Sequence, residues 1–258
     1  MYKFLQFLIL SILLVACNDV PQPTANTKNK ETNSTEKVVS EKTAENEQDE
    51  LPKGMILHEK DTLVPVDYYN KAIYWDLKYA TADNFMHRVL YDTLKLVYVQ
   101  NRVAKKLAAC QTFLSKQNPS YHLLVYDGLR PLSVQREMWE ALDTIPVAER
   151  GKFVSNPANG SVHNYGAAID ITICSSKKSP LDMGAGYDDI RKIAYPSLEA
   201  QFLASGELSK EQVANRQLLR KVLRHQGFIN IPSEWWHFNE FSRNQVKNNY
   251  SIVLNEIY

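Results

Sequence analysis

Cysteine is scarce in this sequence, with three residues in 258. So small a number excludes the secreted scaffolds whose fold depends on a dense disulfide framework. An excess of one charge sign is also missing, because 30 basic and 29 acidic residues leave a net charge of +1. This balance argues against a nucleic-acid partner bound by phosphate neutralisation. Beyond the N-terminal segment no run of about 20 apolar residues occurs, which excludes a protein with several membrane-spanning helices.

The N-terminus has the pattern of a secretory leader. Residues 1–16 place Lys3 ahead of an apolar run, and a run of this length favours a signal peptide over a spanning helix. The run ends in Leu14-Val15-Ala16-Cys17, which resembles the bacterial lipobox, in which the cysteine is lipidated and becomes the new N-terminus. We therefore expect Cys17 to anchor the protein to a bacterial membrane in the cell envelope, facing away from the cytoplasm. The alternative is a plain signal peptide with an incidental cysteine.

The segment after the leader has the composition of a flexible acidic tether. Residues 18–50 contain eight acidic and four basic side chains and no aromatic residue. Such a segment buries too little apolar surface to offset the entropy of ordering it. Because the composition changes near Leu51, we expect a signal peptide at 1–16, a lipidated tether at 17–54 and a folded domain at 55–258.

Hydrophobic periodicity predicts helices and strands that follow no regular alternation. Helices are expected at residues 101–117, from 131 and at 211–226, and strands at 73–79, 121–127, 167–173, 228–231 and 235–238. In residues 167–173 the odd-numbered positions are all apolar, whereas the even-numbered positions include Asp170 and Thr172. This alternation is typical of a half-buried strand. The mixture favours an α+β fold, a single compact domain with a small, mostly antiparallel sheet flanked by helices.

His163 and Asp170 are the first candidates for chemistry. Gly166 follows His163 closely and permits a turn, and Asp170 lies in an otherwise apolar strand beside the small Ala168. A carboxylate in such a strand is costly unless it is paired or bound to a metal. A zinc ion held by His163, Asp170 and a later histidine would keep a fourth position for water. The alternative is a histidine–aspartate hydrogen bond that braces a loop.

Glu234 and His237 flank two tryptophans that would exclude bulk water. A glutamate beside a metal-bound water serves as a general base. Residues three apart in a regular strand point to opposite faces, so we expect Glu234 at the mouth of the strand or at a bulge.

Arg130 follows a predicted buried strand and immediately precedes a predicted helix. An arginine there is placed to meet the oxyanion that develops when water attacks a carbonyl. An ion pair with Asp127 across the turn is the structural alternative. Both interpretations are compatible, because Asp127 would orient the arginine.

Together these motifs resemble the zinc D-alanyl-D-alanine dipeptidases of the VanX type. The matching patterns are S-x-H-x-x-G-x-A-x-D at residues 161–170, E-x-W-H at 234–237 and D-G-x-R-P at 127–131, with further matches at 76–84 and 181–184. The resemblance extends over about residues 60–245. It implies a compact α+β fold related to cell-wall D,D-peptidases and hydrolysis of D-alanyl-D-alanine.

The resemblance also assigns roles to individual residues. It implies one zinc ion bound by His163, Asp170 and His237. Glu234 would be the base and Arg130 the stabiliser of the transition state. By the same match, Asp182 would hold the ammonium of the dipeptide and Ser161 would help to position it.

Two other functions stay open at this stage. One is a D,D- or L,D-carboxypeptidase that acts on larger peptidoglycan peptides. The other is a catalytically silent wall-binding lipoprotein with a structural zinc, although such a site requires neither Glu234 nor Arg130. Cys110 and Cys174 are expected as buried, reduced thiols, with a disulfide between them as the alternative.

Overall fold

The computed structural model describes residues 56–58 and 61–256. These residues fall within the domain predicted at 55–258, whereas the expected leader, Cys17 and the tether lie outside the described residues. Within the described ranges, no helix combines the length and the apolar character that crossing a membrane requires.

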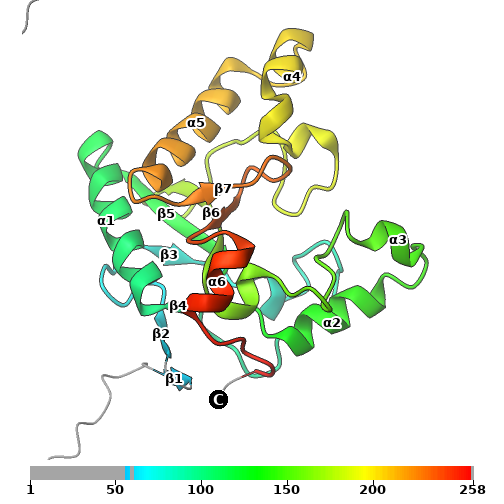
Figure 1. The fold of residues 1–258 in the computed structure, drawn as a ribbon. Coiled ribbons are helices and arrows are strands. Elements are labelled where there is room, and N and C mark those ends of the chain that lie inside the picture. Colours follow the sequence, from blue (N-terminus) through cyan, green and yellow to red (C-terminus); the bar gives the residue numbers. More distant parts are fainter. Residues whose placement is uncertain (1–55, 59–60, 257–258) are drawn as a thin grey trace, which may run out of the picture. The chain divides into compact units, whose positions relative to one another are not determined.

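A five-stranded sheet lies at the centre of the domain (Figure 1), and two of the candidate residues, Asp170 and His237, lie on its strands. Its strands lie in the order β3 (Tyr74–Trp75), β5 (Tyr121–Asp127), β6 (Ala168–Ser175), β8 (His237–Asn239) and β7 (Ile229–Asn230). Only β3 and β5 pair in parallel, and the other neighbours are antiparallel. A second, antiparallel sheet has the order β1 (Ile56–His58), β2 (Asp61–Pro65) and β4 (Tyr98–Gln100). The predicted α+β architecture with mostly antiparallel pairing is confirmed.

Two long helices pack against the five-stranded sheet. α1 (Asn101–Gln117) has the predicted bounds, and its stripe of Val103, Leu107, Cys110 and Leu114 is fully buried. α5 (Lys210–Arg224) begins after a capping box formed by Ser209 and Gln212 and ends before Gly227, whose φ of 76° takes the left-handed conformation. The shorter helices are α2 (Leu132–Ala141), α3 (Val147–Arg150), α4 (Glu199–Ser205) and α6 (Arg243–Asn249). Short 3-10 helices are η1 (Lys78–Ala80), η2 (Val162–Tyr165), η3 (Lys192–Ala194) and η4 (Pro196–Leu198).

Two of the predicted strands differ from the strands in the structure. The strand expected at 73–79 is reduced to β3, because the chain turns into η1 and thereby buries Tyr79. The strand expected to be half-buried at 167–173 is buried on both faces. Its isoleucines belong to the main core, while Ala168 packs with Val246 of α6 on the other face. A strand covered on both sides therefore carries Asp170 into the interior.

Cys110 and Cys174 are both buried and free, as expected. Burial raises the pKa of the Cys110 thiol to about 12 and that of Cys174 to about 11. Thiols with such pKa values remain protonated at neutral pH, so neither cysteine has the thiolate character that metal binding or nucleophilic attack requires.

Candidate active site

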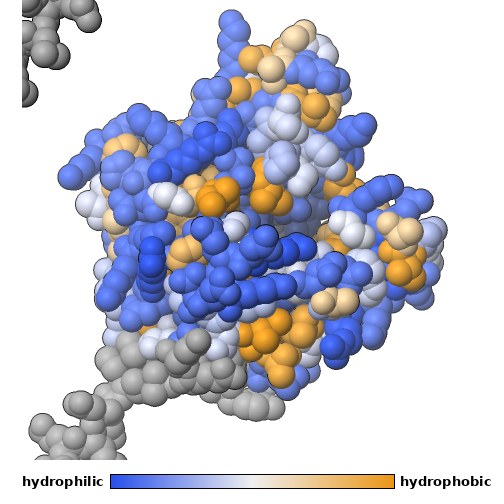
Figure 2. Space-filling model, in the orientation of Figure 1, coloured by the Kyte–Doolittle hydropathy of each residue, from blue (hydrophilic) through white to orange (hydrophobic). Residues whose placement is uncertain are grey.

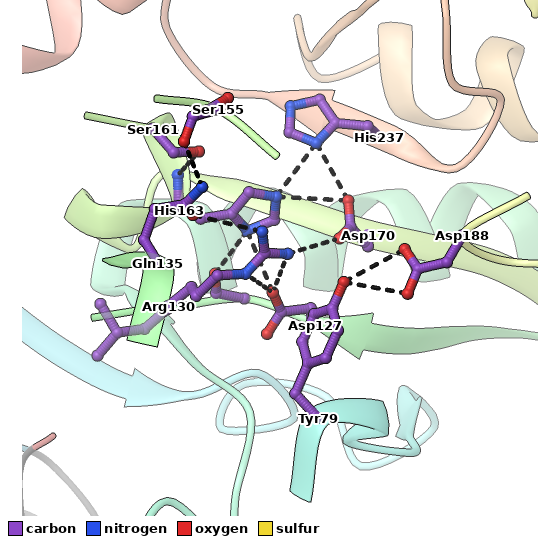
Figure 3. A network of polar contacts seen from close by, with 12 residues as sticks. Tyr79, Asp127, Arg130, Gln135, Ser155, Ser161, His163, Asp170, Asp188 and His237 are labelled. Atoms are coloured by element: carbon purple, nitrogen blue, oxygen red, sulfur yellow. Dashed lines mark hydrogen bonds and ion pairs between the residues drawn. The ribbon is translucent and has the colours of Figure 1, made fainter. Parts of the chain in front are cut away.

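Three side chains from separate elements meet beside the five-stranded sheet. His163 lies on η2, Asp170 on β6 and His237 on β8, where Asp170 and His237 are direct cross-strand partners. Asp170 Oδ1 lies 3.4 Å from His163 Nε2 and 3.1 Å from His237 Nδ1. One donor atom from each of the three lies within 4.8 Å of the others. Figure 3 shows the three groups converging, as the sequence motif predicts for a metal site.

Local hydrogen bonds hold His163 in place. The Ser161 hydroxyl accepts from the His163 amide, and the Asn164 side chain accepts from the Ser161 amide, so a capping box starts η2. Gly166 ends it with a φ of 63°, and an added Cβ would lie 2.9 Å from a Leu63 methyl group. Glycine is required there because a side chain would be strained and crowded.

The donor set fits a metal ion. His163 donates its Nδ1 hydrogen to the carbonyl oxygen of Gly128 at 2.7 Å, since a carbonyl oxygen only accepts. The ring nitrogen left to bind a metal is then Nε2, which faces Asp170 and His237. Burial alone would raise the pKa of Asp170, but the two facing imidazoles hold it well below its ordinary value. Two imidazole nitrogens and an ionised carboxylate are the ligands that divalent transition metals prefer.

Arg130 points toward this cluster from the end of β5. Its Nε and Nη2 donate to Asp127 Oδ2 at 2.9 and 2.6 Å, and Nη2 also lies 3.3 Å from Asp170 Oδ2. Although burial opposes the charge, Asp127 raises the pKa of Arg130 well above its ordinary value. The ion pair expected from the sequence is therefore present, and it fixes a cation next to the three candidate metal ligands.

Glu234 lies in the turn that precedes β8, at the mouth of the strand as predicted. Its Oε2 is 3.8 Å from His237 Nδ1, and the side chain is half-buried. Burial raises the pKa of Glu234 above its ordinary value. The flanking Trp235 and Trp236 are 3% and 4% exposed. A carboxylate with a raised pKa, shielded by buried aromatic rings, suits general-base chemistry.

These groups line a cleft of about 330 Å³, and Ser161 lies in its wall. Figure 2 shows this face of the molecule as largely hydrophilic and hollowed between the regions of α3 and α4. In Figure 3, Ser155 and Asp188 lie on opposite sides of the three converging ligands. Arg243 donates to the Ser155 hydroxyl at 3.3 Å. The cleft therefore carries a cation on one side and a carboxylate on the other.

Asp182, predicted to meet the substrate ammonium, does not lie in this cleft, so the structure does not bring it together with the other predicted site residues. Its side chain is exposed and accepts from the Gly184 amide and from Gln212, both at 2.8 Å. It lines a neighbouring hollow instead. Asp182 caps the turn at Met183 and Gly184. The chain reaches the cleft only after this turn.

Asp188, six residues further along the chain, does line the cleft. The Tyr79 hydroxyl donates to it, and burial together with the nearby Asp170 raises its pKa well above the ordinary value. From the sequence, Asp188 and Asp189 are indistinguishable neighbours after a glycine-containing turn. The signal in the sequence that points to Asp188 is weak: two further aspartates, Asp188 and Asp189, come shortly after Asp182.

Comparisons with known proteins show which family the chain matches. The Peptidase_M15 family model, described as D-ala-D-ala dipeptidase, matches residues 59–255. The D-alanyl-D-alanine dipeptidase of Escherichia coli (strain K12) is 29% identical over 163 residues, which cover 63% of this chain and 76% of that protein. The enzyme of the same name from Enterococcus faecium is 29% identical over 187 residues, covering 65% and 85%. Among solved structures, the LdcB LD-carboxypeptidase matches with a TM-score of 0.40 and 14% identity, covering 78% of this chain and 76% of its own.

Proposed function

Because the chain belongs to the D-Ala-D-Ala dipeptidase family of metallopeptidases, we propose that it hydrolyses the dipeptide D-alanyl-D-alanine to D-alanine. The observation that carries this proposal is the convergence of His163, Asp170 and His237 in one cleft with a half-buried glutamate and a buried arginine. A site built only for structural stability requires neither Glu234 nor Arg130.

We propose zinc as the metal, one ion bound by His163, Asp170 and His237. Three protein ligands of these types leave a fourth position open, which is the catalytic arrangement for zinc. When bound there, zinc would polarise the scissile carbonyl and bring the pKa of a bound water to about 7.

Glu234 is the general base in this proposal. Its carboxylate is beside the ligand atom of His237, so it reaches the attacking water, takes its proton and returns a proton to the leaving amine. Arg130 meets the negative charge that develops on the carbonyl oxygen. Asp127 keeps the guanidinium in position, so the charge is oriented before the reaction starts.

The two sides of the cleft match the two charges of a free dipeptide. Asp188 is a half-buried carboxylate whose pKa is raised by desolvation and by the nearby Asp170, so an incoming ammonium would supply a favourable counter-charge. Arg243, beside Ser155, faces the substrate carboxylate from the opposite side, with Ser161 in the wall between. An internal peptide bond has no ammonium at this point and would leave Asp188 without a cationic partner from the substrate.

The decisive experiment compares four substrates with the purified, zinc-loaded protein. D-Ala-D-Ala, L-Ala-L-Ala, N-acetyl-D-Ala-D-Ala and a muropeptide ending in D-Ala-D-Ala are incubated separately, and released alanine is measured. The proposal expects rapid cleavage of the free D,D-dipeptide alone. Equal cleavage of the N-acetylated substrate or the muropeptide would favour the carboxypeptidase alternative. Absence of cleavage with zinc bound would favour the wall-binding alternative.

We also propose that the protein is a lipoprotein of the cell envelope. The support is the sequence pattern alone, an apolar leader that ends at the lipobox-like Leu14-Val15-Ala16-Cys17. A diacylated or triacylated terminus adds about 0.8 kcal/mol of membrane affinity per buried methylene, so several chains suffice for stable anchoring.

A further inference from the structure

Two of the three metal ligands are held by side chains that are not ligands themselves. His237 Nε2 lies 2.9 Å from Asn239 Oδ1, and the Tyr187 hydroxyl lies 3.1 Å from Asp170 Oδ2. We propose that Asn239 and Tyr187 are positioning residues that orient these two ligands and thereby set the metal affinity of the site. This inference rests on the metal site of the proposed function, and its measurements do not depend on turnover.

Strand geometry places Asn239 where it can act on His237. The two residues are two apart on β8, so their side chains leave the same face of the strand. The amide oxygen accepts the Nε2 hydrogen of the imidazole, which leaves the lone pair on Nδ1. Nδ1 is the atom that faces Asp170 Oδ1 and His163 Nε2, both at 3.1 Å. Asn239 thus selects the tautomer that presents the correct nitrogen to an ion.

Tyr187 acts on the other ligand by occupying one carboxylate oxygen. Its hydroxyl and Arg130 Nη2, at 3.1 and 3.3 Å, both donate to Asp170 Oδ2. Oδ1 is then the oxygen that faces the two histidines. The arrangement favours monodentate metal binding by Asp170 through Oδ1, because Oδ2 already accepts hydrogen bonds from two donors.

The Tyr187 ring is itself fixed by packing. It lies 4.9 Å from the Tyr126 ring and 5.6 Å, edge to face, from Trp236. A ring held on two sides restricts its hydroxyl to a small region, so little entropy is lost when the hydrogen bond forms. The hydroxyl orients Asp170 and the ring packs against its neighbours, so a mutation that removes the hydroxyl alone tests the first contribution without the second.

The test measures zinc affinity by chelator competition on the purified, metal-free protein. Tyr187→Phe removes only the hydroxyl, and Asn239→Val removes the amide while keeping a residue that strands accept. Because partners of metal ligands typically contribute 10- to 100-fold in affinity, each variant should bind zinc about 10- to 100-fold more weakly. Asn239→Asp keeps an oxygen acceptor and should restore most of the affinity. The visible absorption of the cobalt-loaded variants should change with the ligand geometry.

Matched controls separate this role from simple packing. Tyr126→Phe removes a hydroxyl from the neighbouring ring, and Asn230→Val replaces an asparagine on the adjacent strand β7 whose amide oxygen accepts from Arg224. Both should bind zinc like the wild type. The melting temperature of each metal-free protein is measured alongside.

Three results would overturn the inference. The first is wild-type zinc affinity in both Tyr187→Phe and Asn239→Val. The second is a loss of affinity matched by an equal loss in the controls, or by a lower melting temperature of the metal-free variant that accounts for it. The third is a wild-type protein that binds no zinc. A wild-type protein that binds zinc but does not cleave the dipeptide contradicts the proposed function and leaves the affinity comparison valid.

Discussion

Tyr79 and Asp188, 109 residues apart in the chain, meet at the wall of the cleft, where the tyrosine hydroxyl donates to the two carboxylate oxygens at 3.2 and 3.0 Å. The guanidinium of Arg130 lies 4.8 Å from the centre of the same tyrosine ring. One buried ring therefore contacts both the proposed ammonium ligand and the proposed oxyanion partner. Tyr79 therefore contributes, together with Asp127 on the other side of Arg130, to the separation of the two groups that has to match the substrate.

Replacement of Asp188 should discriminate between free and blocked dipeptides. Asp188→Asn should lower kcat/KM for D-Ala-D-Ala by roughly 30-fold to several-thousandfold, because removing one partner of a buried charge pair costs about 2–5 kcal/mol. Hydrolysis of N-acetyl-D-Ala-D-Ala should change little. Asp182→Asn is the matched control and should retain wild-type kinetics. The reverse result, with Asp182 sensitive and Asp188 insensitive, would restore the original sequence-based assignment.

His163→Ala and His237→Ala should each lose zinc. Each change removes one of the three proposed protein ligands from the site. Metal analysis of the purified variants checks this, with His225→Ala as the control, since His225 is exposed and stacks on Phe113. Full zinc occupancy in both ligand variants would contradict the assignment.

Glu234→Gln should retain zinc and lose most of its hydrolytic activity. A general base contributes about 10²- to 10⁴-fold to the rate, and glutamine cannot accept the proton. Metal content and steady-state kinetics are measured on the same sample. The exposed Glu211→Gln on α5 serves as the control for a neutralised glutamate. Turnover close to wild type in a zinc-replete Glu234→Gln protein would remove this residue from the mechanism.

Glu256 should stabilise the fold at neutral pH and cease to do so in acid. Its carboxylate accepts from the amides of Asp92, Thr93 and Leu94 at 2.7–2.9 Å. Although burial works in the other direction, these hydrogen bonds lower its pKa below the ordinary value of 4.5. Because the pKa of the folded state is lower, the stabilisation is fully present above the unfolded pKa and is lost as the pH falls through the folded pKa.

Denaturant unfolding at several pH values checks this prediction. Glu256→Gln should lower the free energy of unfolding by about 1–3 kcal/mol at pH 7, as expected for loss of charged hydrogen bonds. The difference from wild type should shrink below about pH 4.5. Glu149→Gln disrupts an exposed ion pair with Lys152 and should change the free energy of unfolding by less than about 1 kcal/mol. A Glu256 effect that is independent of pH would point to packing instead.

Cys17 should carry a lipid. Metabolic labelling with a fatty-acid probe should mark the wild-type protein, and Cys17→Ser should remain unlabelled and uncleaved. Equal labelling of both would contradict the anchor without affecting the proposed enzymatic activity.

The sequence predicts those parts of the structure in which local pattern and burial agree. The apolar stripe of residues 103–114 predicts α1 with its observed bounds, and the short apolar run at 121–127 predicts β5. The motifs at residues 161–170 and 234–237 point to His163, Asp170 and His237, because the residue spacing within each motif matches the family pattern. The fold brings these three together, as those motifs imply.

The failures have a common physical cause, which is tertiary contact. Alternation in residues 167–173 predicts one solvated face, but α6 covers that face at Ala168. Asp182 and Asp188 are six residues apart in one segment, and only the path of the chain decides which one turns inward. No local signal marks Asn239 and Tyr187 as supports of the ligands, since their importance comes from where His237 and Asp170 lie.

His163 and His237 are 74 residues apart, and an ion shared by them would act as a crosslink. It would close a loop that contains β6, α4, α5 and β7, and the entropy of an unfolded chain falls when so long a loop is closed. Ligand binding to the native state alone also raises stability with the logarithm of free ligand concentration. A zinc ion bound by these residues would therefore also stabilise the fold reversibly, so the melting temperature of the protein should rise with the concentration of free zinc.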